Sequence, residues 1–274
     1  MREFENIAYI DFQKTGTTTI VHALCELLDE REVYKDVHGP VPRSFGRGKP
    51  CFISVREPLS IYISLFNFAT GHQRGGLYEL LRKKGFGDFY RPDLGSFERW
   101  LEFMLDPKSA PNFSRKYGEA SPFEHVGFLT VRLLYMSLPR FEKRSEKQKL
   151  RSQADVRDLF RRKRIFDDYV RTENLTDDLF AFLSQHAGRI RLRQPLHSSG
   201  DVPSGVEVRN RSRKIRELVP QNVSAALKER VREREWLFYE SFGYDLDASG
   251  RPPKSLAKCL SAAGAGEASA ALAS

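Results

Sequence analysis

The sequence predicts a single α/β domain, a three-layer sandwich in which helices flank a central parallel sheet of four to five strands. Two observations support this fold class. A short apolar run is followed by a tight polar segment and then by a helical pattern, first at residues 7–28 and again at residues 51–66. This repeated order is typical of parallel sheets with right-handed crossovers. The length of 274 residues is compatible with one large domain.

The first elements are predicted from their own patterns. Residues 7–12 are a run of β-branched, aromatic and other apolar side chains, which favours a buried strand. Residues 13–19 then form a tight loop before an amphipathic helix. Residues 51–55 predict a second strand. Pro58 suits the first turn of the following helix, because its ring fixes φ near the helical value.

The remainder of the chain predicts fewer strands. A third strand is predicted at residues 168–171, before a helix at 176–186. The glycine- and arginine-rich residues 71–95 predict a loop, and the strongly basic stretch 140–171 predicts a solvated helical region or a mobile insertion. Further helices are predicted at 97–105, 128–138 and 221–241, a loop at 197–213, one domain over 1–247, and a disordered Pro-, Gly-, Ser- and Ala-rich tail over 248–274.

Composition restricts the class of partner and the compartment. The formal charge of +9 favours polyanionic partners, which include nucleotides, nucleic acid, anionic lipid and acidic sugars. Three cysteines without metal-ligand spacing, Cys25, Cys51 and Cys259, favour a reducing compartment. The first twelve residues do not have the apolar stretch of a secretory signal, and no later segment has the length of a membrane span. We therefore expect a cytoplasmic protein without stable membrane insertion.

The loop after the first strand has the composition of an anion-binding site. It leads into a helix start, where backbone N–H groups are unsatisfied and the helix dipole favours negative charge. Gly16 allows close approach of the backbone to a ligand, and Lys14 adds a positive charge. In the Walker loop the lysine directly follows the last glycine, whereas here it precedes the only glycine of the loop by two residues, so the Walker pattern fails. The loop reads Gln13-Lys14-Thr15-Gly16-Thr17-Thr18-Thr19.

A second motif extends this observation. The Lys-Thr-Gly-Thr-Thr run resembles the 5′-phosphosulfate loop of sulfotransferases that use 3′-phosphoadenosine 5′-phosphosulfate (PAPS). Those enzymes bind the 3′-phosphate with an arginine at a strand end and a serine eight residues later. Arg56 and Ser64 match that spacing, and the run Arg-Glu-Pro-Leu-Ser from Arg56 resembles the carbohydrate branch of the family. The resemblance covers mainly residues 5–68, with weaker matches at 169–175, 209–212 and 242–245, and none over 71–165.

The resemblance implies an enzyme that transfers a sulfuryl group from PAPS to an acceptor hydroxyl. A glycan is the expected acceptor, and a lipid, a small metabolite and tyrosine are the alternatives that the sequence leaves open. It implies a P-loop-like fold, no metal, no nucleic-acid partner, and a nucleotide that lies across the carboxyl ends of the strands. Lys14 is then the residue expected to stabilise the leaving oxygen. The residues implied to bind the nucleotide are Lys14, Thr15, Gly16, Thr17, Thr18, Thr19, Arg56 and Ser64.

Such a reaction also needs a general base, because the acceptor hydroxyl loses its proton during attack. His38 is the candidate, since the segment Val37-His38-Gly39-Pro40 resembles the His-Gly-His segment that carries the catalytic histidine of uronyl 2-O-sulfotransferases. Pro40 stands here in place of the second histidine. Glu57 and Glu119 are alternative bases, since some relatives use a glutamate.

Two other functions share the strand–loop–helix start. A P-loop nucleotide kinase predicts a Walker glycine and a magnesium-binding aspartate after a hydrophobic strand, and neither is evident. A non-catalytic module that binds polyanions on the same fold predicts decayed nucleotide motifs, whereas Lys14, Gly16, Thr17, Arg56 and Ser64 occur together. RNA-binding proteins carry stacking aromatic residues interleaved with basic residues on their strands, and this pattern does not occur in the sequence.

Overall fold

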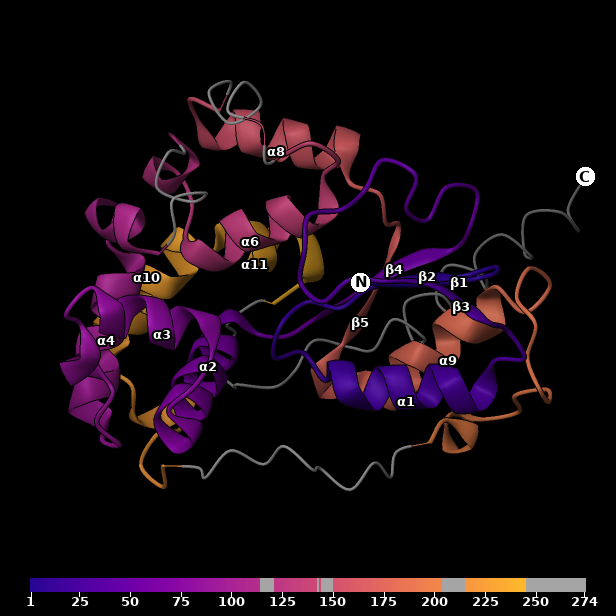
Figure 1. Cartoon of the computed structure of the whole chain (residues 1–274), viewed down its shortest axis with the longest axis horizontal. Helices are drawn as coiled ribbons and strands as arrows, with labels where there is room; N and C mark the ends of the chain where they lie inside the picture. Colours follow the sequence, from indigo (N-terminus) through magenta and orange to yellow (C-terminus); the bar gives the residue numbers. More distant parts are fainter. Residues whose placement is uncertain (114–120, 142, 144–149, 204–214, 245–274) are drawn as a thin grey trace, which may run out of the picture.

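The computed structural model describes residues 1–113, 121–141, 143, 150–203 and 215–244. Its centre is a five-stranded mixed sheet with the strand order β3-β1-β2-β4-β5 (Figure 1). The strands are β1 (Arg2–Phe4), β2 (Ala8–Ile10), β3 (Glu32–Lys35), β4 (Cys51–Val55) and β5 (Asp168–Arg171).

The parallel sheet predicted from the sequence is confirmed for β2, β4 and β5. Ile10 pairs with Ile53, and Ile53 in turn pairs with Tyr169, in parallel register. Strand β1 is antiparallel to both β2 and β3, so the prediction of a purely parallel sheet was wrong in this half. The sequence did not indicate β1 or β3, because β3 is largely exposed and neither strand carries a run of buried apolar residues.

One face of the sheet is covered by α1 (Thr17–Leu27) and α9 (Leu175–Gln185) (Figure 1). The strands present Tyr9, Phe52 and Val170 to this face, where they join one apolar cluster with both helices. Helix α1 contributes a stripe spaced four and three residues apart, which places its members on one side of the helix. The stripe consists of Ile20, Leu24 and Leu27.

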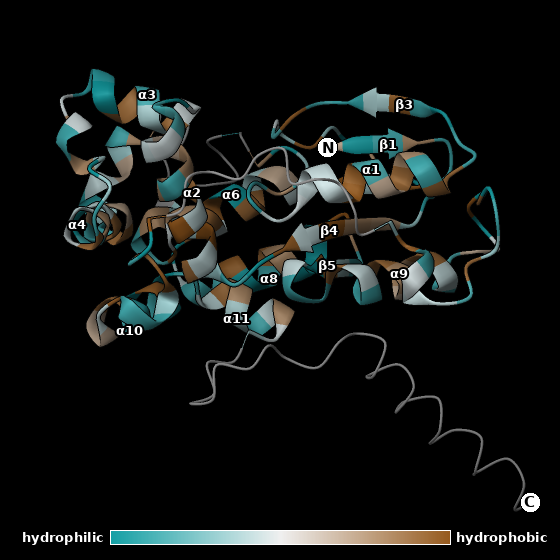
Figure 2. Cartoon of the chain, turned by 90° about the horizontal axis from the view of Figure 1, so that it is seen from below, coloured by the Kyte–Doolittle hydropathy of each residue, from teal (hydrophilic) through white to brown (hydrophobic). Residues whose placement is uncertain are grey.

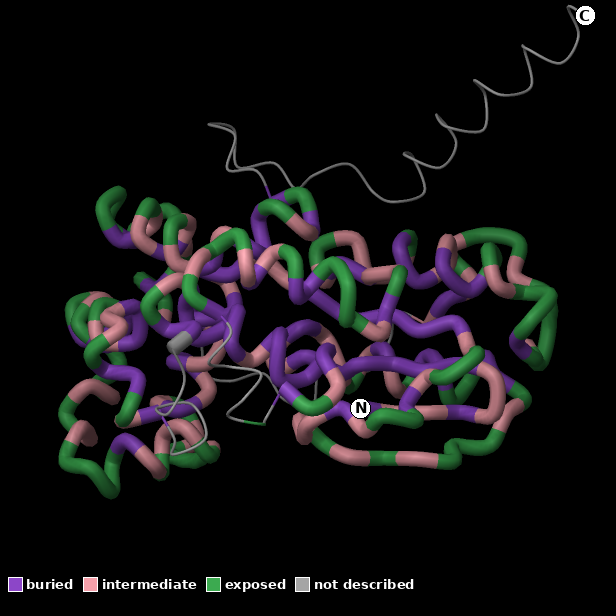
Figure 3. Tube along the Cα trace, turned by 90° about the horizontal axis from the view of Figure 1, so that it is seen from above, coloured by how far each residue is buried: buried purple, intermediate pink, exposed green. Residues whose placement is uncertain are grey.

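The opposite face is covered by α6 (Phe128–Ser137) and α11 (Trp236–Phe242). The rings of Phe12 and Phe238 meet there at a centroid distance of 5.6 Å. The buried apolar residues of both helices belong to the larger core cluster. Brown segments mark apolar residues near the middle of the molecule in Figure 2, and Figure 3 shows the buried centre of the molecule in purple. Beside the sheet, three helices contact one another: α2 (Pro58–His72), α4 (Leu94–Leu105) and α10 (Ala225–Arg234). The short 3-10 helix η1 (Gly87–Phe89) contacts both α4 and α3 (Gly76–Lys83).

Two predictions of local structure were wrong. The predicted loop at 71–95 contains α3, which forms because Leu81 is buried among the neighbouring helices, and packing outweighs the flanking glycines. The single helix predicted at 221–241 is divided at Glu235, whose fully buried carboxylate turns inward to cap the start of α6. The predicted strand at 51–55 and the helices at 97–105, 128–138 and 176–186 are confirmed with small shifts of their ends.

The basic stretch 140–171 contains α8 (Gln153–Lys163), which begins at the capping side chain of Ser152 and buries Val156, Leu159 and Phe160. Helix α8 is therefore packed against the core on one side and exposed to solvent on the other. None of the helices in the described ranges is long and apolar enough to cross a membrane. The predicted tail 248–274 and the segment 209–212 lie outside the described residues.

Candidate functional site

The loop between β2 and α1 has the backbone shape of an anion cradle. Lys14 and Gly16 both adopt left-handed backbone angles, with φ of 64° and 79°. Gly16 is the residue that precedes α1, and a Cβ atom there would lie 2.8 Å from Cδ1 of Leu175. No acidic residue lies in the first turn of α1, and no side chain caps it. The N–H groups of this turn are therefore available to an external anion.

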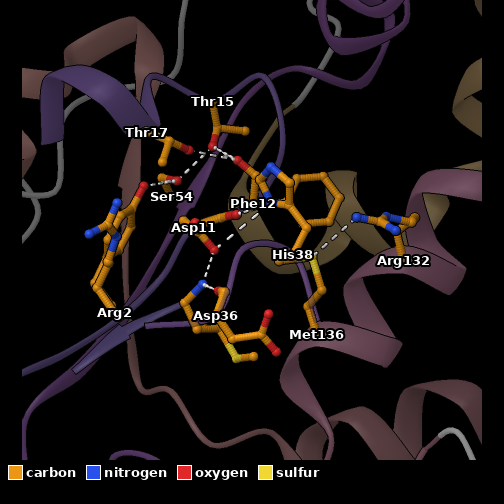
Figure 4. A network of polar contacts seen from close by, with 12 residues as sticks. Arg2, Asp11, Phe12, Thr15, Thr17, Asp36, His38, Ser54, Arg132 and Met136 are labelled. Atoms are coloured by element: carbon orange, nitrogen blue, oxygen red, sulfur yellow. Dashed lines mark hydrogen bonds and ion pairs between the residues drawn. The ribbon is translucent and has the colours of Figure 1, made fainter. Parts of the chain in front are cut away.

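A chain of buried hydroxyl groups supports the loop from below (Figure 4). The Thr15 hydroxyl donates to the Phe12 carbonyl oxygen at 2.5 Å, and it lies 2.6 Å from the Ser54 hydroxyl. Because each hydroxyl has one proton, Ser54 must donate to Thr15. Tyr9, 2.7 Å from Ser54, must then donate to Ser54. This chain ties the loop to β2 and β4, and it leaves the backbone of Thr15 rather than its hydroxyl for a ligand.

Removing Ser54 from this chain is expected to destabilise the fold. Ser54→Ala leaves the Tyr9 proton and the Thr15 oxygen without their partner in a buried site, so we expect a loss of about 1–3 kcal/mol in the free energy of unfolding. Tyr9→Phe removes a donor but leaves no orphaned proton, so its loss should be smaller. Urea unfolding of both variants tests this order, and a larger loss in Tyr9→Phe would contradict the assigned direction of the chain.

The three threonines after Gly16 differ in their surroundings. The Thr17 hydroxyl donates to the Phe12 carbonyl oxygen at 3.2 Å. Thr18 is exposed in the first turn of α1, and Thr19 is half-buried in the same turn. Thr18 is thus the most exposed residue of the three.

Lys14 and Arg56 meet at the carboxyl ends of β2 and β4. A guanidinium nitrogen (Nη1) of Arg56 lies 3.5 Å from the carbonyl oxygen of Lys14. Within the described ranges, neither side chain forms an ion pair with a carboxylate. Burial, together with the positive charge of Arg56, lowers the pKa of Lys14 to about 8. Two adjacent cations are therefore held here without a compensating acid.

Ser64 and Phe68 lie on the same side of helix α2, and this side faces Lys14. The ammonium nitrogen of Lys14 lies over the Phe68 ring, 4.3 Å from its centroid. Ser64 precedes Phe68 by four residues, and residues with this spacing lie on the same side of a helix. Ser64 is half-buried on that side, so the structure brings the side of α2 that carries Ser64 to the loop.

His38 lies on the connection after β3, at the end of β2 (Figure 4). Its Nδ1 is 2.9 Å from the carbonyl oxygen of Asp11, which can only accept, so Nδ1 carries the proton and Nε2 carries the lone pair. The side chain is 33% exposed. Burial lowers the pKa of His38, the Asp11 carboxylate opposes this, and Arg132 adds to the lowering. The imidazole is thus neutral near pH 7, with one nitrogen able to accept a proton.

Of the two alternative bases, Glu57 has structural partners in the described part of the chain. The Glu57 carboxylate caps α2 through the N–H groups of Leu59 and Ser60 and accepts the Tyr239 hydroxyl at 3.0 Å. Glu173 accepts the Glu57 N–H at 2.9 Å. These contacts make a structural role the simpler explanation for the Glu57 carboxylate. Glu119 lies outside the described residues.

Sequence reasoning missed two residues of this site, Ser54 and Phe68. Ser54 lay inside a predicted strand and was not distinguished from its apolar neighbours. Phe68 stands four residues after Ser64, and this helical spacing could have indicated it. The described residues hold no group of three or more His, Cys, Asp or Glu side chains arranged to bind a metal.

Comparison with known proteins does not extend this description. No protein-family model, no curated protein and no solved structure matches the chain.

Proposed function

We propose that the protein is a sulfotransferase that moves a sulfuryl group from PAPS to an acceptor hydroxyl, on a P-loop-like α/β fold. The observation that carries the proposal is the pair Lys14 and Arg56, held without an acidic partner in the described structure beside the open N-terminus of α1. Such a pair is stabilised when anionic groups bind between the two strand ends. PAPS carries anionic groups at both its 5′ and 3′ ends.

In this proposal the two cations bind different ends of the donor. The loop N–H groups and Lys14 contact the 5′-phosphosulfate, while Arg56 and Ser64 contact the 3′-phosphate. The spacing of Arg56 and Ser64 supports this division, because Arg56 directly follows the last residue of β4 and Ser64 lies in the second turn of α2. A nucleotide would then lie across the carboxyl ends of β2 and β4, where ligands of open α/β sheets bind.

The reaction is a single in-line displacement. The acceptor oxygen forms a bond to sulfur while the bond from sulfur to the bridging oxygen of the 5′-phosphate breaks, and the electron pair leaves with that oxygen. Lys14 stabilises the charge that develops there. The proton of the acceptor hydroxyl passes to Nε2 of His38. The products are the sulfated acceptor, expected to be a glycan, and adenosine 3′,5′-bisphosphate.

Calorimetric titration with adenosine 3′,5′-bisphosphate tests the proposal. We expect the wild type to bind this product with micromolar affinity and adenosine 5′-monophosphate much more weakly. Arg56→Ala should weaken product binding at least tenfold, because the 3′-phosphate loses its charged partner. Arg193→Ala is the matched control: it removes the same charge beside Asp29, at the far end of α1, and should leave the affinity unchanged.

Two outcomes would contradict the proposal. Equal affinity for the bisphosphate and the monophosphate would show that the protein does not recognise the 3′-phosphate, and it would favour a phosphotransferase. Binding of anionic polysaccharide without binding of either nucleotide would favour a non-catalytic module.

A further inference from the structure

The Lys14 ammonium group has a positive charge beside it and an aromatic ring as its contact. Arg56 is an adjacent cation, and neither Lys14 nor Arg56 forms an ion pair with a carboxylate among the described residues. The contact that Lys14 does make is to the face of Phe68, at 4.3 Å from the ring centroid. The ring face is electron-rich and attracts a cation without carrying a formal charge.

An aromatic partner and a carboxylate partner would affect anion binding by Lys14 in different ways. A carboxylate partner would hold Lys14 more strongly, but it would also repel a phosphate or sulfate and would have to be displaced by it. An aromatic face holds the ammonium group in place and leaves its charge uncompensated. The ring therefore provides orientation without competing for the ligand.

Phe68 is itself held in position. His72, one turn later on α2, packs against its ring with a centroid distance of 4.9 Å. Arg74 places its guanidinium carbon 5.7 Å from the same ring centroid. Gly75 follows with a left-handed φ of 118°, and a Cβ there would lie 3.4 Å from the ring. The charged or titratable groups around Lys14 and Phe68 are thus Arg56, His72 and Arg74, and the described residues add no acid to them.

We propose that Phe68 is a positioning residue for Lys14, whose ring face holds the protonated ammonium group at the phosphate loop in place of an acidic partner. The inference rests on the proposed function for its meaning in catalysis. Its physical content, the stabilisation of charged Lys14 by the ring, can be measured without any donor or acceptor.

The measurement is the pH dependence of Lys14 labelling with trace acetic anhydride, followed by mass spectrometry of the Lys14 peptide. In the wild type the pKa of Lys14 should lie at about 8. Phe68→Leu keeps Lys14 covered but removes the π face. The Lys14 amine should then bind its proton about three- to tenfold more weakly, so the pKa of Lys14 should fall. Phe68→Tyr keeps the face and should retain the wild-type value. Phe103→Leu alters an aromatic cluster that includes Phe86, Phe89 and Phe113 and should have no effect.

Phe68→Met offers a second variant if Phe68→Leu folds poorly, because it fills similar space without an aromatic face. An unchanged or raised pKa of Lys14 in the folded Leu and Met variants overturns the inference, whatever the activity. Turnover adds a separate readout: the two variants should lose it at lower pH than the wild type, and Phe68→Tyr should not. A wild type that binds no adenosine 3′,5′-bisphosphate, yet shows the lowered pKa in Phe68→Leu, would defeat the proposed function and leave the Lys14–Phe68 coupling intact.

Discussion

Lys14→Met is expected to lower turnover by about 10²- to 10³-fold, the usual loss when one preorganised group that stabilises a leaving oxygen is removed. Methionine keeps most of the length of the side chain over Phe68 and removes only the charge. Binding of adenosine 3′,5′-bisphosphate should weaken by a smaller factor, because the loop N–H groups and Arg56 remain. Transfer from radiolabelled PAPS to a panel of oligosaccharides, and to water, provides the rate. Turnover within threefold of the wild type would exclude Lys14 from the transition state.

His38 and Lys14 together predict a bell-shaped pH profile for the proposed reaction of the wild type. In the proposed reaction His38 must be neutral to accept a proton, and burial lowers its pKa, so activity should rise with pH through a midpoint below the usual histidine pKa. Lys14 must be charged, so activity should fall as pH rises through its pKa of about 8. His38→Gln should abolish the acidic limb and keep product binding. A basic limb that persists in Lys14→Met would assign it to another group.

Gly127→Ala is expected to be the most destabilising small substitution in the described core. A Cβ at Gly127 would lie 2.1 Å from Oε1 of Glu235 and 2.5 Å from its carboxyl carbon. The Glu235 carboxylate is fully buried and accepts the N–H groups of Leu129 and Thr130 together with the Thr130 and Tyr62 hydroxyls. Moving it would leave several of these donors without an acceptor, so we expect a loss of about 3 kcal/mol or more in the free energy of unfolding.

Gly188→Ala is the matched control for this substitution, because no atom lies within 4 Å of a Cβ built there. Its free energy of unfolding should stay within about 0.5 kcal/mol of the wild type. Thermal and urea unfolding of the two variants measure the difference. Equal stability of Gly127→Ala and Gly188→Ala would show that Glu235 can move at little cost.

The parallel half of the sheet and the loop were predictable because their signals are local. A buried strand such as residues 51–55 is a continuous apolar run, and its length and period can be read from the sequence. The charge and the glycine of the loop at residues 13–19, and the spacing from Arg56 to Ser64, are likewise local patterns. They were sufficient to place Lys14, Gly16 and Arg56 near one another at adjacent strand ends, as the structure has them.

Elements stabilised by distant neighbours could not be predicted in the same way. Strand β3 is mostly exposed and depends on pairing with β1. Strand β1 lies at the start of the chain and is separated from β3 by β2 and α1. The break between α10 and α11 occurs because Glu235 caps α6, more than one hundred residues earlier in the chain. No pattern within residues 221–241 records that contact.

The sequence by itself determined the strand–loop–helix units and the cations that they carry, because backbone period and residue type act over a few neighbouring positions. Only the tertiary structure decided which groups those cations face. The ring of Phe68 over Lys14, and the hydroxyl chain from Tyr9 through Ser54 to Thr15, join elements that are separate in the chain. Such contacts depend on distances of a few ångströms between packed layers, and those distances are set when the helices and the sheet come together.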